Sequence, residues 1–171
     1  MRLMEIEAFA FNYIEIKWHG PYLWPKRSGA LSASTTDRDI LALPGIYRAE
    51  TPGKDRKIIK YIGSASNSFG ERLSNRHTIY TKLVAAPRLV NMFLGQIIPE
   101  KKLTITRKQI VEIEYILQNV HYHDLISWHG LSKLPKTSRG EGWHITNTGA
   151  RRGLKRIIAY PAFAISERHA S

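Results

Sequence analysis

Cysteine is absent from the 171 residues, and acidic side chains are scarce relative to basic ones. Without cysteine the chain has no disulfide framework and no thiolate zinc site, which is typical of a reducing compartment. Long apolar runs are also missing. The N-terminal residues are interrupted by Glu5, Glu7 and Glu15, unlike a signal peptide, and no run approaches the length that spans a membrane. We therefore expect a cytoplasmic protein without a membrane partner.

The charge balance is strongly basic, with 26 lysine and arginine residues against 14 acidic ones and a net charge of +12 at pH 7. A surplus of this size favours a polyanionic partner, and nucleic acid is the first candidate. The simpler interpretation is a basic surface that serves only solubility, because net charge governs association rather than fold. With 171 residues and 43% hydrophobic side chains, the chain is predicted to form a single domain over residues 1–171.

Apolar alternation and turn residues predict a chain of the α+β class. A strand or two over residues 5–18 is followed by a turn in WHGPYLWP, residues 18–25. Residues 26–40 are small and polar, which predicts a loop with helical character near 36–42. Beyond this loop the predicted order is strand, strand, helix, strand, helix.

The first two of these strands are predicted to form an antiparallel hairpin. Two β-prone runs, 45–50 and 57–63, flank TPGKD, which has the residues of a turn. The expected register sets Tyr47 opposite Lys60 or Tyr61, so that the two tyrosines share one face. A slip of one residue would send one tyrosine to the other face.

A helix is predicted to follow the hairpin. Ser68 and Glu71 have the spacing of a capping box, which predicts a helix that begins at about Phe69. Arg72 then lies in the first turn and Arg76 one turn later on the same side. Because a helix N-terminus favours anions, an arginine beside it makes a credible phosphate site.

A third strand is predicted over residues 89–98, followed by a second helix. Thr106 and Gln109 form another capping box, and the helix continues through Val120. Its apolar face consists of Ile110, Ile113, Ile116, Leu117 and Val120. A short strand over 143–146 and a turn in the NTG that follows it complete the predicted elements.

Two motifs carry a resemblance to a known family. PGIYRAE at 44–50 and KYIG at 60–63, followed by an arginine in the next helix and a glutamate in a later one, resemble a GIY-YIG nuclease. The resemblance covers about residues 44–120 as a nuclease core, with additions over 1–43 and 121–171. It implies a small domain with a central three-stranded antiparallel sheet flanked by helices. It also implies DNA cleavage with one divalent ion per site, Mg²⁺ or Mn²⁺.

The resemblance also implies residue roles. Tyr47 and Tyr61 match the two family tyrosines, one of which serves as the general base for the attacking water or helps to form it. Arg72 matches the arginine that stabilises charge on the scissile phosphate. The family often has a histidine one turn later, and here Arg76 occupies that place and His77 follows it.

A tyrosine needs help to act as a base. Its ordinary pKa near ~10 keeps it protonated at neutral pH, so a nearby cation must lower that pKa. Lys60 is the candidate in the hairpin. It points to the strand face opposite Tyr61, and would assist Tyr47 across the hairpin in only one register.

The metal ligand implied by the resemblance is Glu114 or Glu112. Two residues on a helix correspond to a rotation of about 200°, so only one of them can face the site. The resemblance favours Glu114, because IEYIL is similar to the family's glutamate followed by apolar residues two and three positions later. Asn147 matches a structural asparagine late in the family, or else forms a turn.

Basic residues gather in the C-terminal part, where they would follow a phosphate backbone. They are Arg139, Arg151, Arg152, Lys155 and Arg156, with Lys133 and Lys136. A solvated surface is the alternative interpretation.

The leading hypothesis from the sequence is a magnesium-dependent DNA endonuclease of a restriction, defence or mobile-element kind, with a homodimer left open. The second hypothesis is a nucleic-acid-binding module that keeps the fold without the activity. The third is an interaction protein whose basic face binds an acidic partner.

Overall fold

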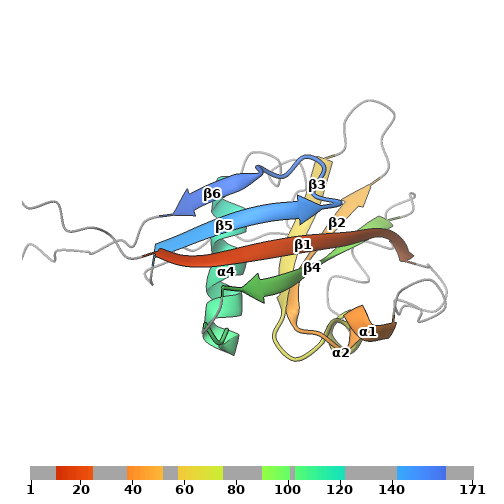
Figure 1. The fold of residues 1–171 in the computed structure, drawn as a ribbon. Helices are drawn as coiled ribbons and strands as arrows, with labels where there is room; N and C mark the ends of the chain where they lie inside the picture. Colours follow the sequence, from red (N-terminus) through yellow and green to blue (C-terminus); the bar gives the residue numbers. More distant parts are fainter. Residues whose placement is uncertain are drawn as a thin grey trace, which may run out of the picture.

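The computed structural model describes residues 11–24, 38–51, 58–74, 90–100, 103–121 and 142–160. The elements in chain order are β1 (Phe11–Trp24), α1 (Arg38–Leu41), β2 (Gly45–Thr51), β3 (Ile58–Ala65), α2 (Phe69–Arg72), β4 (Val90–Pro99), α4 (Arg107–Val120), β5 (Gly142–Gly149) and β6 (Ile157–Tyr160). Figure 1 shows a curled sheet with few helices around it, so the predicted α+β class is confirmed.

The sheet has six strands in the order β3-β2-β4-β1-β5-β6. All neighbouring strands are antiparallel except β1 and β5, which are parallel. The expectation of a three-stranded sheet is therefore wrong in the number of strands. The three strands predicted within residues 45–98 do lie side by side, as β3-β2-β4, and β1, β5 and β6 extend the same sheet. The expected N- and C-terminal additions thus contribute strands to it.

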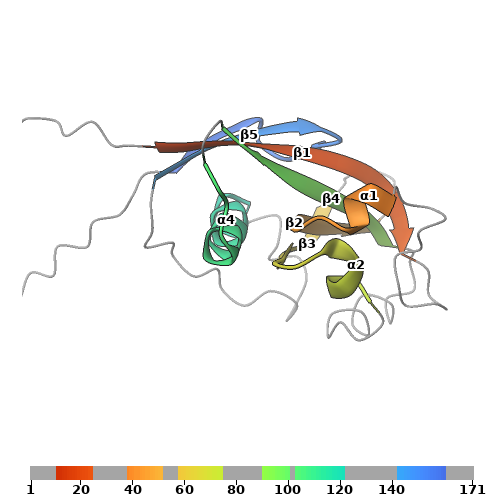
Figure 2. The ribbon, with the colours of Figure 1, turned by 60° about the horizontal axis from the view of Figure 1, so that its bottom comes forward.

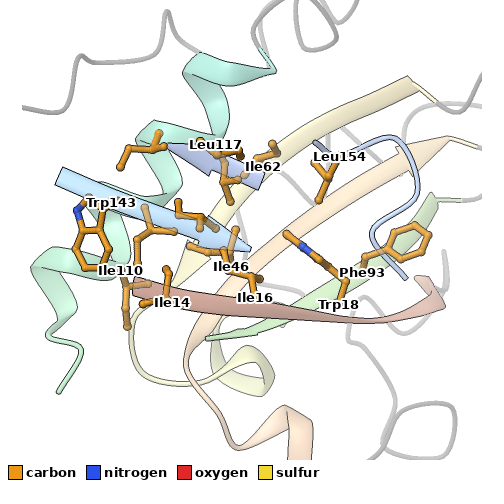
Figure 3. Close-up of a cluster of buried hydrophobic side chains, with 14 residues drawn as sticks. Ile14, Ile16, Trp18, Ile46, Ile62, Phe93, Ile110, Leu117, Trp143 and Leu154 are labelled. Carbon is orange, nitrogen blue, oxygen red and sulfur yellow. The ribbon is translucent and has the colours of Figure 1, made fainter. Parts of the chain in front are cut away.

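Helices cover both faces of the β2–β3 hairpin. Figure 2 shows α4 on one side of these strands and α1 and α2 on the other. Successive strand residues point to opposite faces, so each side has its own apolar cluster. The α4 side, shown in Figure 3, contains Ile14, Ile16, Trp18, Ile46, Ile62, Phe93, Ile110, Ile113, Ile116, Leu117, Trp143, Ile145, Leu154 and Ile158. The α1–α2 side contains Ile40, Tyr47, Ala49, Ala65, Phe69, Leu73, Met92 and Leu94.

Helix α4 begins and ends where the sequence predicts. The Thr106 hydroxyl accepts a hydrogen bond from the Gln109 amide, and the Thr106 amide donates to the Gln109 side chain at 2.9 Å, so the capping box is reciprocal. Four of the five predicted apolar residues are buried, and Val120 packs against them half-buried. The local signal was sufficient here because both capping partners lie within one turn.

The hairpin is confirmed, but its register is not the expected one. Tyr47 lies opposite Gly63, and Tyr61 lies opposite Ala49. A register shift follows between Ala49 and Glu50. The pairing differs by two residues from the register that set Tyr47 opposite Tyr61, so the two tyrosines still share one face as diagonal neighbours.

Two predicted turns are wrong. The first, within residues 18–25, is part of β1, whose pairing with β4 shifts register between His19 and Tyr22. The second, at 147–149, is the end of β5, and Gly149 there has φ of 64°. In both places strand pairing outweighs the local turn chemistry. Predicted elements at 5–10, 26–37 and 75–89 lie outside the described residues.

Among the described helices, none combines the length and the apolar character needed to cross a bilayer.

Candidate active site

The two motif tyrosines lie together on the α1–α2 face of the hairpin. Tyr47 is 1% exposed and Tyr61 is half-buried, and their ring centroids are 5.9 Å apart at an angle of 34°. The side chain of each tyrosine shifts the pKa of the other. The hairpin thus presents a coupled pair of phenols rather than two independent side chains.

Gly63 makes this pairing possible. A Cβ atom built at Gly63 would lie 2.5 Å from the Tyr47 hydroxyl oxygen and 2.6 Å from Cε1 of Tyr61. No real Cβ atom tolerates such contacts with ring atoms, so any side chain here would separate the rings. The second glycine of the two motifs is therefore required by the tyrosine packing itself.

Helix α2 brings Arg72 to the same region. Ser68 caps the helix by accepting a hydrogen bond from the Glu71 amide at 3.2 Å, as the sequence predicts. The Glu71 carboxylate accepts from the Asn67 side chain, so only the Ser68 half of the expected capping box is formed. Phe69 is fully buried against the sheet, and its amide donates to the Leu43 carbonyl at 2.9 Å. One turn of helix anchored in this way leaves Arg72 exposed.

Glu114 extends from α4 to β3. One carboxylate oxygen accepts a short hydrogen bond from the Ser64 hydroxyl, and the other accepts from the Gln118 amide at 2.9 Å. The Gln118 amide also donates to the Ile62 carbonyl at 2.9 Å. Glu114 is therefore held against the strand that carries Tyr61, at the edge of the sheet.

The ionisation of these groups shows that they influence one another. Burial raises the pKa of Tyr47 well above 10, and the charge of Glu114 adds to the rise while that of Arg72 opposes it. Burial and Glu114 raise the pKa of Tyr61 to about 12, again opposed by Arg72. Two strands and two helices thus bring two phenols, a guanidinium and a carboxylate within electrostatic range of each other.

The carboxyl group of Glu114 has a raised pKa. Its burial favours the neutral form, whereas the hydrogen bond from Ser64, the charge of Arg72 and the hydrogen bond from Gln118 favour the ionised form. The arrangement keeps a partly desolvated carboxylate beside an arginine. Such a carboxylate suits a cation, because a nearby positive charge would offset the cost of its burial.

Several predicted site residues cannot be placed. Arg76, His77 and Arg139 lie outside the described residues, as does the side chain of Lys60. Glu112 is half-buried two positions before Glu114 on α4. Of the two glutamates, Glu114 is the one whose charge acts on both tyrosines.

Asn147 has a structural place in the sheet. It is 1% exposed within β5. Its side-chain oxygen Oδ1 accepts a hydrogen bond from Trp18 Nε1 at 2.9 Å, and its side-chain nitrogen Nδ2 donates to the Lys155 carbonyl at 2.8 Å. The turn-forming alternative is therefore wrong. The predicted basic residues that follow it, Arg151, Arg152, Lys155 and Arg156, all lie in the connection from β5 to β6.

Arg48 was missed by the sequence analysis. A strand arginine usually lies in solvent, yet this one is fully buried and forms a 3.0 Å ion pair with buried Glu50. The available signal was its spacing from Glu50, which puts the two opposite charges on the same strand face.

Comparison of the chain with family models, with curated proteins and with solved structures finds no match in any of the three. The side chains of Tyr47, Tyr61, Arg72 and Glu114 are therefore the features of this chain that bear on its function. Those residues come from four separate elements, and they are the four that the resemblance singled out for phenol, guanidinium and metal-ligand roles.

Proposed function

We propose that this protein is a metal-dependent DNA endonuclease of the GIY-YIG kind, which hydrolyses phosphodiester bonds. The observation that carries the proposal is the electrostatic coupling of Tyr47, Tyr61, Arg72 and Glu114. An arginine for phosphate charge, a carboxylate for a hard cation and a hydroxyl near the attacking water are the groups that this hydrolysis needs. The net charge of +12 favours a polyanionic substrate.

Each group has a defined task. During hydrolysis a water oxygen attacks phosphorus, the bond from phosphorus to the leaving oxygen breaks, and that oxygen takes up a proton. Exposed Arg72 neutralises the charge that accumulates on the phosphoryl oxygens. Tyr47 and Tyr61 are protonated at neutral pH, so they orient the water by hydrogen bonding. They accept its proton only when a cation lowers their pKa, and Arg72 already acts in that direction.

A single carboxylate fits Mg²⁺ or Mn²⁺. Mg²⁺ is usually bound by one or two carboxylates and keeps several waters, so Glu114 suffices as the protein ligand. Within the part of the chain that the structure describes, no cluster of three or more His, Cys, Asp or Glu side chains is present. A divalent ion beside Glu114 would supply Lewis-acid polarisation of the phosphate.

Cleavage of supercoiled plasmid in the presence of Mg²⁺ tests the proposal. Glu114→Ala and Arg72→Ala are expected to lower the cleavage rate by about 100-fold or more, as removal of a charge-stabilising group does elsewhere. Two control variants, Glu112→Ala and Arg107→Ala, each remove one charge of the same sign from another position, on α4. Both should retain most of the activity. Equal activity of all four variants and the wild type would refute the site.

A second candidate is a nucleic-acid-binding module without activity. It is favoured by the raised pKa of both tyrosines and by the engagement of Glu114 with Ser64 and Gln118. This candidate predicts salt-sensitive binding to DNA and no cleavage of duplex, nicked or branched substrates with Mg²⁺ or Mn²⁺.

A further inference from the structure

The connection between β5 and β6 is a compact basic loop, defined here as residues 149–156. Residues 142–160 contain no acidic side chain. Arg152, Lys155 and Arg156 are exposed, and no carboxylate among the described residues forms an ion pair with them. A cationic surface that no described carboxylate neutralises is suited to bind an anion.

The backbone of this loop is fixed by hydrogen bonds from the sheet. The Ala150 amide donates to the Trp18 carbonyl at 2.8 Å. Asn147 holds the far end, since its backbone amide donates to the Arg156 carbonyl at 2.7 Å and its side chain to the Lys155 carbonyl. Leu154 is buried in the α4-side core, as Figure 3 shows. The side chains of Arg152, Lys155 and Arg156 therefore extend from a backbone that hydrogen bonds hold in place.

Arg48 adds a tether from the hairpin. Its two terminal nitrogens donate to the Arg151 carbonyl at 2.7 Å and to the Ala150 carbonyl at 2.8 Å. The guanidinium lies 4.8 Å from the ring centroid of Trp18 and 4.2 Å from that of Phe93. A buried apolar residue would fill this space without the free-energy cost of desolvating a charge, but it could not donate hydrogen bonds to two carbonyl groups. The structure thus uses a buried charge to position the loop.

Arg152 lies near this buried charge. Its guanidinium is 5.0 Å from the same Phe93 ring, and its backbone has φ of 46°. Burial and, to a smaller extent, the charge of Arg152 lower the pKa of Arg48 to about 10, against the effect of Glu50. Two like charges around one ring repel each other, so an anion bound at the loop would relieve a repulsion that the fold already contains.

The loop lies on the α4 side of the sheet, as does Glu114. Arg48 pairs with Ile62, whose carbonyl is held by the same Gln118 that holds Glu114. From strand spacing and rise, the Cα atoms of Arg48 and Ser64 are roughly 8 Å apart. A DNA backbone that approaches the candidate active site would therefore reach the loop within a few nucleotides.

We propose that residues 149–156 form a preorganised binding surface for the nucleic-acid phosphate backbone, and that Arg48 is the positioning residue that holds this surface beside the candidate active site. The inference rests on the proposed function for the choice of DNA as the polyanion. The proposed binding surface differs from a merely solvated basic surface in one respect. The geometry of the loop, and not only its charge, determines the affinity.

The first experiment measures DNA affinity in EDTA by fluorescence anisotropy, with a 20-base-pair duplex. One variant carries Arg152→Gln, Lys155→Gln and Arg156→Gln. A matched control, equal in net charge, changes three exposed cations elsewhere: Lys17→Gln, Arg38→Gln and Lys108→Gln. Loss of three phosphate contacts should weaken binding about 100-fold at 0.1 M salt and reduce the salt slope by about 3. The control should lose less than about fivefold, as expected for long-range charge alone.

Equal losses in the two triple variants would overturn the inference, and so would an unchanged affinity of the loop variant. Because no metal is present, the result does not depend on cleavage. If the loop variant loses affinity and the wild type never cuts DNA, the binding surface stands and the catalytic proposal fails. If the wild type cuts DNA and the loop variant binds and cuts it normally, the catalytic proposal stands and the binding surface fails. If the loop variant lost as much affinity for polyglutamate as for DNA, the surface would not be specific for phosphate.

The second experiment tests Arg48 by hydrogen exchange and DNA affinity. In the double variant Arg48→Met and Glu50→Leu, apolar residues replace the ion pair, which is often neutral for stability. Arg48→Lys keeps a cation beside Glu50 but lacks the planar fork that binds two carbonyls. Both variants should bind DNA about tenfold more weakly, with faster amide exchange confined to 149–156. Unchanged affinity, or faster exchange throughout the sheet, would contradict a positioning role.

Discussion

Gly63 sets the distance between the two phenols of the candidate site. Because a Cβ atom there would overlap Tyr47 and Tyr61, Gly63→Ala is expected to destabilise the fold by about 1–3 kcal/mol through overpacking and to lower the cleavage rate further than the loss of folded protein explains. Gly153→Ala is the matched control for stability alone, since nothing lies within 4 Å of its added Cβ. Urea unfolding and single-turnover cleavage measure the two effects. A Gly63→Ala variant with wild-type stability and rate would contradict the packing.

Ser64 lowers the pKa of the Glu114 carboxyl group through its hydrogen bond. Its hydrogen bond opposes the rise in pKa that burial causes, so Ser64→Ala should raise this pKa further. The carboxylate must be ionised to hold a cation, and ionised carboxylate is lost as the pH falls through its pKa. The acidic limb of the cleavage rate against pH is therefore expected to move to higher pH in Ser64→Ala and to stay in place in Ser66→Ala. A shift to lower pH would contradict the assigned role of Ser64.

At the residue scale the sequence was partly informative. It predicted Tyr47, Tyr61 and Arg72 through the resemblance, but physical reasoning alone left Glu112 and Glu114 as alternatives. Helix geometry gives only their relative rotation, and the choice depends on where α4 sits on the sheet. Arg48 was missed because its partners, the carbonyls of the β5–β6 loop, lie about a hundred residues away in the chain.

At the scale of elements, helix-capping signals were reliable, whereas turn signals failed where strands pair. Helix α4 and the start of α2 were predicted because a capping box needs only neighbouring residues. The turn expected within 18–25 failed because β1 continues to pair with β4 as far as Trp24, although its pairing with β5 ends at Trp18. The parallel pairing of β1 with β5 joins residues more than a hundred positions apart, and nothing in a short window of sequence reports it.

The capping box of α4 offers a test of an element that carries the metal-ligand candidate. Thr106→Ala removes the acceptor for the Gln109 amide and is expected to cost about 0.5–2 kcal/mol of unfolding free energy. Urea denaturation measures this, with Thr104→Ala as control because Thr104 is exposed and precedes the helix. The rate of cleavage by folded protein should be unaffected. Equal stability of the two variants would contradict a role for the cap.

At the scale of the whole molecule, one sheet carries both halves of the proposed activity. Its β3 edge bears the candidate catalytic groups, while β1 and β5 support the basic loop, and Arg48 in β2 links the two. The three-stranded core expected from the motifs could not disclose this link. The strands that provide it come from outside residues 44–120, in segments that the resemblance does not cover.

The central claim is that the hairpin, α2 and α4 bring two phenols, a guanidinium and a carboxylate within electrostatic range of one another around β3. The most direct measurement is the ionisation of Tyr61, followed by NMR of the ring carbon that bears the hydroxyl and assigned with Tyr61→Phe. The account predicts a pKa near 12 in the wild type, a lower pKa in Glu114→Gln, a higher one in Arg72→Gln and no change in Glu112→Gln. An identical Tyr61 pKa in all four proteins would contradict it.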